Sequence, residues 1–162
     1  MSAAGPSTAK PYLNAPPPSP YDGPSREQVL ALRQEFLTPG LLTYYREPLL
    51  IAQGSMQYVW DDQGKQYLDA FAGVVTVSVG HCHPHVVERV REQVGRLHHT
   101  TTLYLHPTVG QMGQKLAEHM PAGSELHSSY FTNSGSEANE LAMLMSREHT
   151  GNTEIISLRN GY

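Results

Sequence analysis

Residues 133–140, Asn-Ser-Gly-Ser-Glu-Ala-Asn-Glu, constrain the fold of this 162-residue chain more than any other stretch. They lie between a strand-like run at 129–132 and a helix-like run that starts near Glu137. Where a strand turns through small residues into a helix, the first N–H groups of the helix have no intrahelical partner, and the helix dipole favours negative charge there. The pattern therefore predicts an anion-binding turn, and phosphate is the ligand that suits it best.

Three small residues of this turn are the candidate phosphate ligands. Gly135 allows close approach of a ligand and tolerates a positive φ, while Ser134 and Ser136 add hydroxyl donors. The alternative is a well-capped helix that binds nothing, because Ser and Asn are favoured N-caps and glutamates suit a first helical turn. Glu137 and Glu140 have to point away from any bound phosphate. The motif is neither a Walker loop nor a G-x-G-x-x-G fingerprint.

The order of elements after Pro84 predicts an α/β layer with a parallel sheet. Helices are expected at 84–97, 109–120 and 137–149, and strands at 128–132 and 154–158. Ligands of such sheets bind at the carboxyl ends of the strands, where the 133–140 turn lies. The inward face of the last helix is expected to carry Ala138, Leu141, Ala142 and Met145.

The first half of the chain predicts a tail, one helix and a small antiparallel unit. Residues 1–24 hold seven of the 12 prolines, which is typical of a solvated, disordered tail, although a proline-rich partner site is the alternative. Ser25 and Gln28 form a capping-box pattern for a helix that Pro39-Gly40 ends. Strands are expected at 49–53, 56–60 and 65–69, separated by Gly54-Ser55 and by the turn at 61–64.

Composition excludes several classes of function. The formal net charge of −4 gives no electrostatic basis for binding nucleic acid or anionic membranes. No apolar run approaches the ~20 residues of a membrane-spanning helix. The single cysteine, Cys82, excludes an internal disulfide framework and suits a reducing compartment. With no arginine before Arg26, the tail is a poor mitochondrial presequence by composition.

A histidine-rich segment at 80–85, Gly-His-Cys-His-Pro-His, raises the question of a metal site. Structural zinc sites usually combine two separated ligand clusters, and no second cluster with suitable spacing is present. We therefore expect no metal, and interpret the segment as a tight turn before a helix that starts at Pro84.

Four motifs together resemble the class-III, pyridoxal-phosphate-dependent aminotransferases. They are Tyr-Leu-Asp at 67–69, the turn at 80–84, the turn at 133–140 and Arg-Asn-Gly-Tyr at 159–162. The resemblance runs from about Tyr21 to Tyr162. Further segments are similar to the mitochondrial branch of the class that transfers an amino group from alanine to glyoxylate, namely 74–79, 139–143 and 155–160.

The resemblance implies an α/β chain that forms the N-terminal portion of a type-I pyridoxal-phosphate-dependent transferase and is truncated. Residues 1–24 would be the tail, 25–80 the N-terminal helix and antiparallel segment of the small domain, and 81–162 the first part of the large domain with its parallel or mixed sheet. It also implies a homodimer with active sites at the interface, small amino-acid and oxo-acid substrates, and a mitochondrial location, with the cytoplasm as the alternative.

The resemblance also assigns roles to individual residues. Gly135 and Ser136 would hold the phosphate of pyridoxal 5′-phosphate through backbone N–H groups and the Ser136 hydroxyl, with Ser134 beside them. Tyr162 would stack against the pyridine ring. Val74 falls where some relatives place a substrate-contacting aromatic, so the pocket would be smaller and apolar, which suits alanine and glyoxylate.

The cofactor lysine of this class lies beyond the matched motifs, as does the aspartate that pairs with the pyridine nitrogen. None of the three lysines, Lys10, Lys65 and Lys115, fits that role. We therefore expect no catalytic residue in this chain and no transaminase activity from it alone. A sheet cut after two or three strands is also expected to leave open edges and uncovered apolar surface.

Three alternatives remain open at this point. The chain could be a non-catalytic product that pairs with or regulates the complete aminotransferase. It could be a stand-alone phosphate-binding module. It could also belong to a class-III aminotransferase of other specificity, since enzymes acting on ornithine, 4-aminobutyrate or β-alanine share the two turns.

Overall fold

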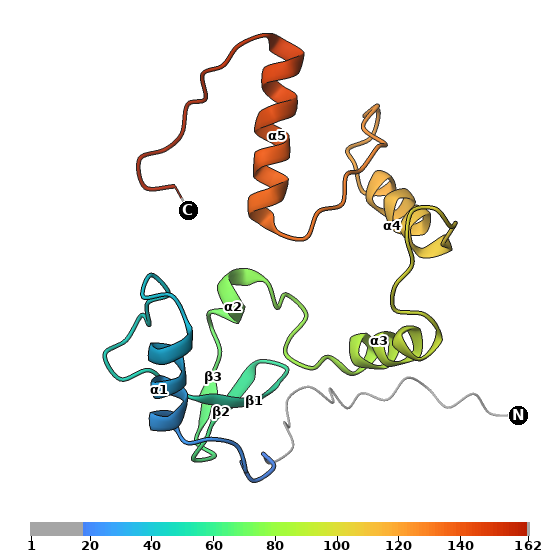
Figure 1. Ribbon diagram of the computed structural model, residues 1–162. Helices are drawn as coiled ribbons and strands as arrows, with labels where there is room; N and C mark the ends of the chain where they lie inside the picture. The colour runs from blue at the N-terminus through green and yellow to red at the C-terminus, as the bar shows by residue number, and fades with distance from the viewer. Residues whose placement is uncertain (1–17, 162) are drawn as a thin grey trace, which may run out of the picture. The chain divides into compact units, whose positions relative to one another are not determined.

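The computed structural model describes residues 18–161, and these divide after His98 into two compact units (Figure 1). Most of the expected tail, residues 1–17, lies outside the described residues, and so does Tyr162. The first unit contains one helix, a small sheet and two further helices, and the second contains two helices.

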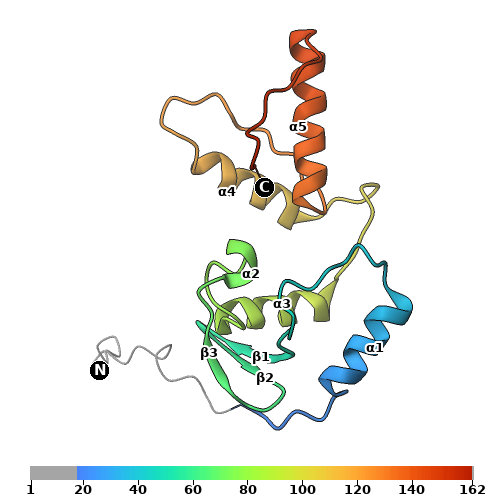
Figure 2. The ribbon, with the colours of Figure 1, turned by 90° about the vertical axis from the view of Figure 1, so that its left-hand side faces the viewer.

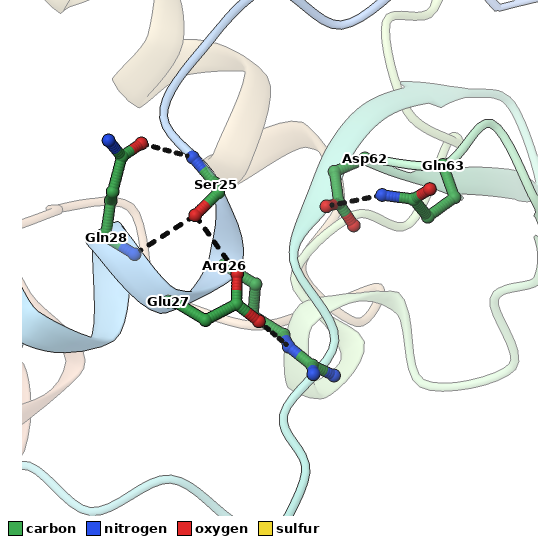
Figure 3. Close-up of polar contacts among 6 residues, drawn as sticks. All are labelled: Ser25, Arg26, Glu27, Gln28, Asp62 and Gln63. Atoms are coloured by element: carbon green, nitrogen blue, oxygen red, sulfur yellow. Dashed lines mark hydrogen bonds and ion pairs between the residues drawn. The ribbon is translucent and has the colours of Figure 1, made fainter.

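Helix α1 (Arg26–Phe36) starts with the capping box that the sequence predicts. Ser25 Oγ accepts a hydrogen bond from the N–H of Gln28 at 3.3 Å, and Gln28 Oε1 accepts one from the N–H of Ser25 at 2.8 Å (Figure 3). The box gives partners to two backbone donors at the helix start. The helix ends at Phe36, because Leu37 takes an extended conformation just before Pro39-Gly40.

The sheet is an antiparallel meander of three strands, β1 (Ile51–Ser55), β2 (Tyr58–Asp61) and β3 (Gln66–Leu68), in that spatial order (Figures 1 and 2). The three expected strands are confirmed with shifted ends.

The prediction that Gly54-Ser55 separates the first two strands is wrong. Gly54 pairs with Val59 and Ser55 with Tyr58, so that the turn lies at 56–57. A Cβ on Gly54 would lie 2.9 Å from His81 Cβ, so this glycine serves close packing within a strand instead of a turn.

Asp61 closes the turn between β2 and β3. Its Oδ1 accepts hydrogen bonds from the N–H groups of Gln63 at 3.0 Å and Lys65 at 2.9 Å, and its Oδ2 accepts one from the Tyr67 hydroxyl at 2.8 Å. The Tyr67 hydroxyl is the main reason why the pKa of Asp61 lies below its usual value. The same bond raises the pKa of Tyr67. Beside Asp61, Trp60 is only 3% exposed and is the one buried apolar side chain among the described residues.

Two helices that differ in length and regularity follow β3. The four-residue α2 (Ala72–Val75) is irregular, because Gly73 and Val74 have left-handed φ values of 61° and 60°. In contrast, α3 (Pro84–Arg96) is a regular helix with His83 as N-cap and Pro84 in its first turn. The interpretation of 80–85 as a tight turn before a helix is therefore confirmed.

The second unit contains the two other helices that the sequence predicts, α4 (Pro107–Glu118) and α5 (Gly135–Thr150). Gly151 ends α5 in the left-handed conformation, with φ of 71° and its N–H bonded to the carbonyl of Arg147. The strands expected at 128–132 and 154–158 are wrong, since both runs are irregular in the structure. A parallel strand depends on neighbouring strands for its hydrogen bonds, and no described residue pairs with either run.

The apolar faces of the helices are largely open within the described part of the chain. In α3, Val90 and Val94 are 55% and 58% exposed. In α5, Leu141 is half-buried, but Met145 is 49% exposed and both Ala138 and Ala142 are exposed, so the expected inward face is wrong here for three of its four residues. The expectation of uncovered apolar surface is confirmed for residues 18–161. Over the same residues, no helix has the length and apolar character needed to cross a membrane.

We expect acid to weaken the meander, because folding holds the pKa of Asp61 below the ordinary 3.8. A carboxyl whose pKa is lowered in the folded state stabilises that state above the unfolded pKa. This contribution is lost as pH falls through the folded value. Fluorescence of Trp60, the single tryptophan, reports the transition. The urea concentration at the midpoint of unfolding should stay constant above about pH 5 and be lower at about pH 3.

Asp61→Asn should flatten that dependence on pH, because the amide does not titrate. Asp62→Asn is the matched control, since the Asp62 carboxylate accepts its hydrogen bond from the exposed Gln63 side chain at 3.1 Å (Figure 3). Equal acid sensitivity of the two variants would contradict the role of Asp61.

Candidate phosphate-binding turn

The 133–140 segment forms the N-terminus of α5, with Ser134 as its N-cap. Ser134 has extended backbone angles, and its Oγ accepts a hydrogen bond from the N–H of Glu137 at 3.1 Å. The helix starts at Gly135, two residues earlier than the sequence predicts. Gly135 and Ser136 are therefore the first two helical residues, whose N–H groups have no intrahelical carbonyl to bond.

Two side chains that the sequence analysis did not assign also fix this turn. Glu137 Oε2 accepts a hydrogen bond from the N–H of Asn133 at 2.6 Å, and Thr132 Oγ1 donates one to the carbonyl of Ser134 at 3.1 Å. The S-x-x-E spacing of Ser134 and Glu137 matches a capping box, but the Glu137 carboxylate accepts from the N–H of Asn133 and not from that of Ser134, so the spacing would have identified only the cap by Ser134. The Glu137 carboxylate therefore lies against Asn133 instead of the N–H groups of Gly135 and Ser136.

Gly135 is not required by the fold of the described chain. Its freedom to take a positive φ is unused, because it belongs to a regular helical turn. A Cβ at this position would meet no atom within 4 Å. Glycine in a helix also costs stability relative to alanine. Close approach of a ligand remains the explanation that the sequence offers for a glycine here.

The other candidate residues lie apart from the turn along the chain. Val74 belongs to the first unit, where it is 42% exposed in the left-handed segment of α2. Tyr162 lies outside the described residues. The roles of these residues, and of Ser134, Gly135 and Ser136, stay predictions.

The remaining chemistry-bearing side chains form no metal cluster within residues 18–161, where no group of three or more His, Cys, Asp and Glu could hold an ion. Cys82 is a free, exposed thiol. Lys65 lies over the ring of Tyr67, with Nζ 5.1 Å from the ring centroid, and so belongs to the meander.

Comparison with known proteins places the chain in a family. A family model of class-III aminotransferases matches residues 43–162. The chain is 48% identical over 152 residues to the mitochondrial alanine–glyoxylate aminotransferase 2 homolog 2 of Arabidopsis thaliana, covering 94% of this chain and 31% of that protein. It is 41% identical over 120 residues to the acetylornithine aminotransferase of Methanopyrus kandleri, covering 74% of this chain and 30% of that protein.

Solved structures agree with this assignment. A phospholyase from Arthrobacter, in complex with phosphoethanolamine, matches with a TM-score of 0.69 and 38% identity over 77% of this chain and 28% of that chain. The taurine:2-oxoglutarate aminotransferase of Bifidobacterium kashiwanohense, in complex with pyridoxal phosphate and glutamate, matches with a TM-score of 0.67 and 25% identity over 81% of this chain and 29% of that chain.

This chain belongs to the class-III aminotransferase family, whose members use pyridoxal phosphate. The expected fold class, part of a type-I pyridoxal-phosphate-dependent transferase, is confirmed by the same comparisons. The chain spans about three tenths of the length of the relatives that it matches.

We expect Ser134→Ala to reduce the helicity of a peptide comprising residues 132–152, because the N–H of Glu137 loses its acceptor. Loss of a serine N-cap typically costs about 1 kcal/mol. Gly135→Ala should increase helicity in the same peptide, because nothing crowds a Cβ there. Circular dichroism at 222 nm measures both changes. If Ser134→Ala were as helical as the parent peptide, the assignment of Ser134 as the cap would be wrong.

Proposed function

We propose that this chain is the part of a pyridoxal-phosphate-dependent transaminase that binds the cofactor phosphate, and that the enzyme transfers an amino group from alanine to glyoxylate. The observation that carries the first half is the geometry of α5. Ser134 caps the N–H of Glu137, while the N–H groups of Gly135 and Ser136 stay at the exposed helix terminus. Such groups bind phosphate well, because the helix dipole favours negative charge there.

The chain's own residues would share the work of holding the phosphate. Gly135 would allow the anion to approach the backbone, because it has no Cβ in the open space before the helix. Ser136 would add a hydroxyl donor to its N–H. Ser134 would act indirectly, by fixing the direction in which these donors point. When bound, pyridoxal phosphate supplies the electron sink that amino-group transfer requires.

Alanine and glyoxylate are supported as substrates by the names of the relatives and by Val74. Relatives named for alanine and glyoxylate match over 90% or more of this chain. A valine at the position proposed for substrate contact leaves a small apolar wall, and Tyr162 would stack on the flat ring of the cofactor. We also propose that the intact protein is a homodimer and, like these relatives by name, mitochondrial.

A second specificity has support of its own, because acetylornithine aminotransferases also match this chain at 38–43% identity. The intact protein is here the complete aminotransferase of which we propose this chain to be a part. Its steady-state rates, measured on protein expressed from the natural coding sequence, separate the two specificities. We expect a higher kcat/KM for alanine with glyoxylate than for acetylornithine with 2-oxoglutarate. The reverse order would overturn alanine and glyoxylate as the substrates, while the membership of the family would stand.

We expect Gly135→Val to weaken binding of pyridoxal phosphate to the intact protein by about 10- to 100-fold, the range for loss of hydrogen bonds to a charged group. Gly110→Val is the matched control, because Gly110 is a helical glycine of the same unit whose Cβ would also meet no atom. Fluorescence titration of the cofactor measures the affinity. Equal affinity of Gly135→Val and the control would overturn the phosphate site.

The 162-residue chain by itself is expected to be inactive, since none of its lysines matches the family's cofactor lysine. Alanine-dependent formation of pyruvate by the purified chain would contradict this expectation.

A further inference from the structure

The segment between β3 and α3 forms a loop, residues 70–80, whose two ends are fastened to the same hairpin turn. At one end, the N–H of Asp69 donates to the carbonyl of Gln57 at 2.8 Å. At the other end, His81 and Met56 exchange two backbone hydrogen bonds, at 2.7 and 2.8 Å. The loop therefore leaves the meander and returns to it at adjacent residues.

A side-chain hydrogen bond between Asp69 and His81 closes the base of this loop. Asp69 Oδ2 lies 2.6 Å from His81 Nε2, and Asp69 Oδ1 accepts hydrogen bonds from the N–H groups of Phe71 and Ala72, both at 2.9 Å. The two side chains are 15% and 25% exposed, respectively. The bond to His81 is the main reason why the pKa of Asp69 is lowered. One carboxylate thus joins the end of the loop to the N–H groups of its second and third residues.

Two glycines show how closely His81 and its neighbour fit the meander. A Cβ on Gly54 in β1 would lie 2.9 Å from both Cβ and Cγ of His81. A Cβ on Gly80, which has φ of 97°, would lie 2.9 Å from the Met56 Cα. The imidazole is therefore held against β1, so that Asp69 has a partner whose position is fixed by the sheet.

The loop that the Asp69–His81 hydrogen bond closes contains a run of left-handed residues. Ala72, Gly73, Val74 and Val75 have φ of 49°, 61°, 60° and 64°. This region is unfavourable for residues with a Cβ and most unfavourable for β-branched ones. Such conformations persist only where surrounding contacts over-determine them. The hydrogen bonds that Asp69 accepts act on Phe71, which precedes this run, and on Ala72, its first residue.

We propose that the hydrogen-bonded pair of Asp69 and His81 is a positioning device that holds residues 72–75 in the left-handed conformation and so sets where Val74 meets the substrate. The part of this proposal that concerns substrate rests on the proposed function, whereas the conformational part does not. Asp69 and His81 are positioning residues, because they act through Val74.

Hydrogen–deuterium exchange of the full 162-residue chain tests the conformational part. We expect exchange in a peptide covering 69–77 to rise by about tenfold or more in Asp69→Ala, which removes the acceptor of two backbone N–H groups. Exchange should rise less in Asp69→Asn, because the amide oxygen of the asparagine can still accept both hydrogen bonds. Asp62→Ala is the matched control on the same meander, and Trp60 fluorescence checks that each variant keeps the sheet. Exchange in Asp69→Ala equal to that of the control would overturn the proposal.

Kinetics of the intact protein test the part that concerns substrate. His81→Phe should raise the KM for alanine by about tenfold with kcat changed less than about threefold, since the pair acts on a substrate wall. His81→Gln should restore much of this loss, because its Nε2 can donate to Asp69. A fall in kcat with unchanged KM, or no rescue by His81→Gln, would overturn it. Absence of alanine activity in the unmodified protein would overturn the proposed function and leave the exchange result standing.

Discussion

The candidate site depends on one hydrogen bond, from the N–H of Glu137 to the side chain of Ser134 at 3.1 Å. This bond decides which donors at the start of α5 are used inside the chain and which face outward. Because Glu137 reaches back to Asn133 at 2.6 Å, its carboxylate does not bond the first helical N–H groups. A helix terminus organised in this way offers two adjacent backbone donors together with the positive end of the dipole.

The same device recurs through the chain, which has little buried core. Ser25 caps α1, Asp61 closes the β2–β3 turn, and Asp69 binds the two donors that lead into α2. In each case a short polar side chain accepts from backbone N–H groups a few residues away. Since Trp60 is the one buried apolar side chain among the described residues, these local acceptors define most of the structure seen here. Among the described residues, long-range hydrogen bonds join the strands of the meander, fasten the loop at His81 to it, and connect the N–H of Ser19 to the side chain of Gln53.

Features with a local cause could be predicted from the sequence. The capping box at Ser25 and the start of α3 at Pro84 both follow from side-chain and ring chemistry within one turn of the chain. The existence of three short strands followed from alternation and turn residues. Gly54 was misassigned, because its reason is a contact with His81, 27 residues further along the chain, that no local pattern shows.

Features with a distant cause could not be predicted in the same way. The strand-like runs at 128–132 and 154–158 have suitable residues, but a strand is defined by its partner, and the described chain pairs none with them. The left-handed run that includes Val74 opposes the β-branched preference of its own residues. At the candidate site, a capped helix N-terminus could be predicted from Ser134 and the residues after it, but the bond from the N–H of Asn133 to the Glu137 carboxylate could not.

The most direct test of the account is the affinity of the intact protein for pyridoxal phosphate compared with pyridoxal, which lacks the phosphate. The account predicts a preference for the phosphate ester of at least about 100-fold, the size expected for several charge-assisted hydrogen bonds. It also predicts that Gly135→Val loses most of this preference while the affinity for pyridoxal is unchanged. A Gly135→Val protein that keeps the full preference would contradict the claim that the N-terminus of α5 binds the phosphate.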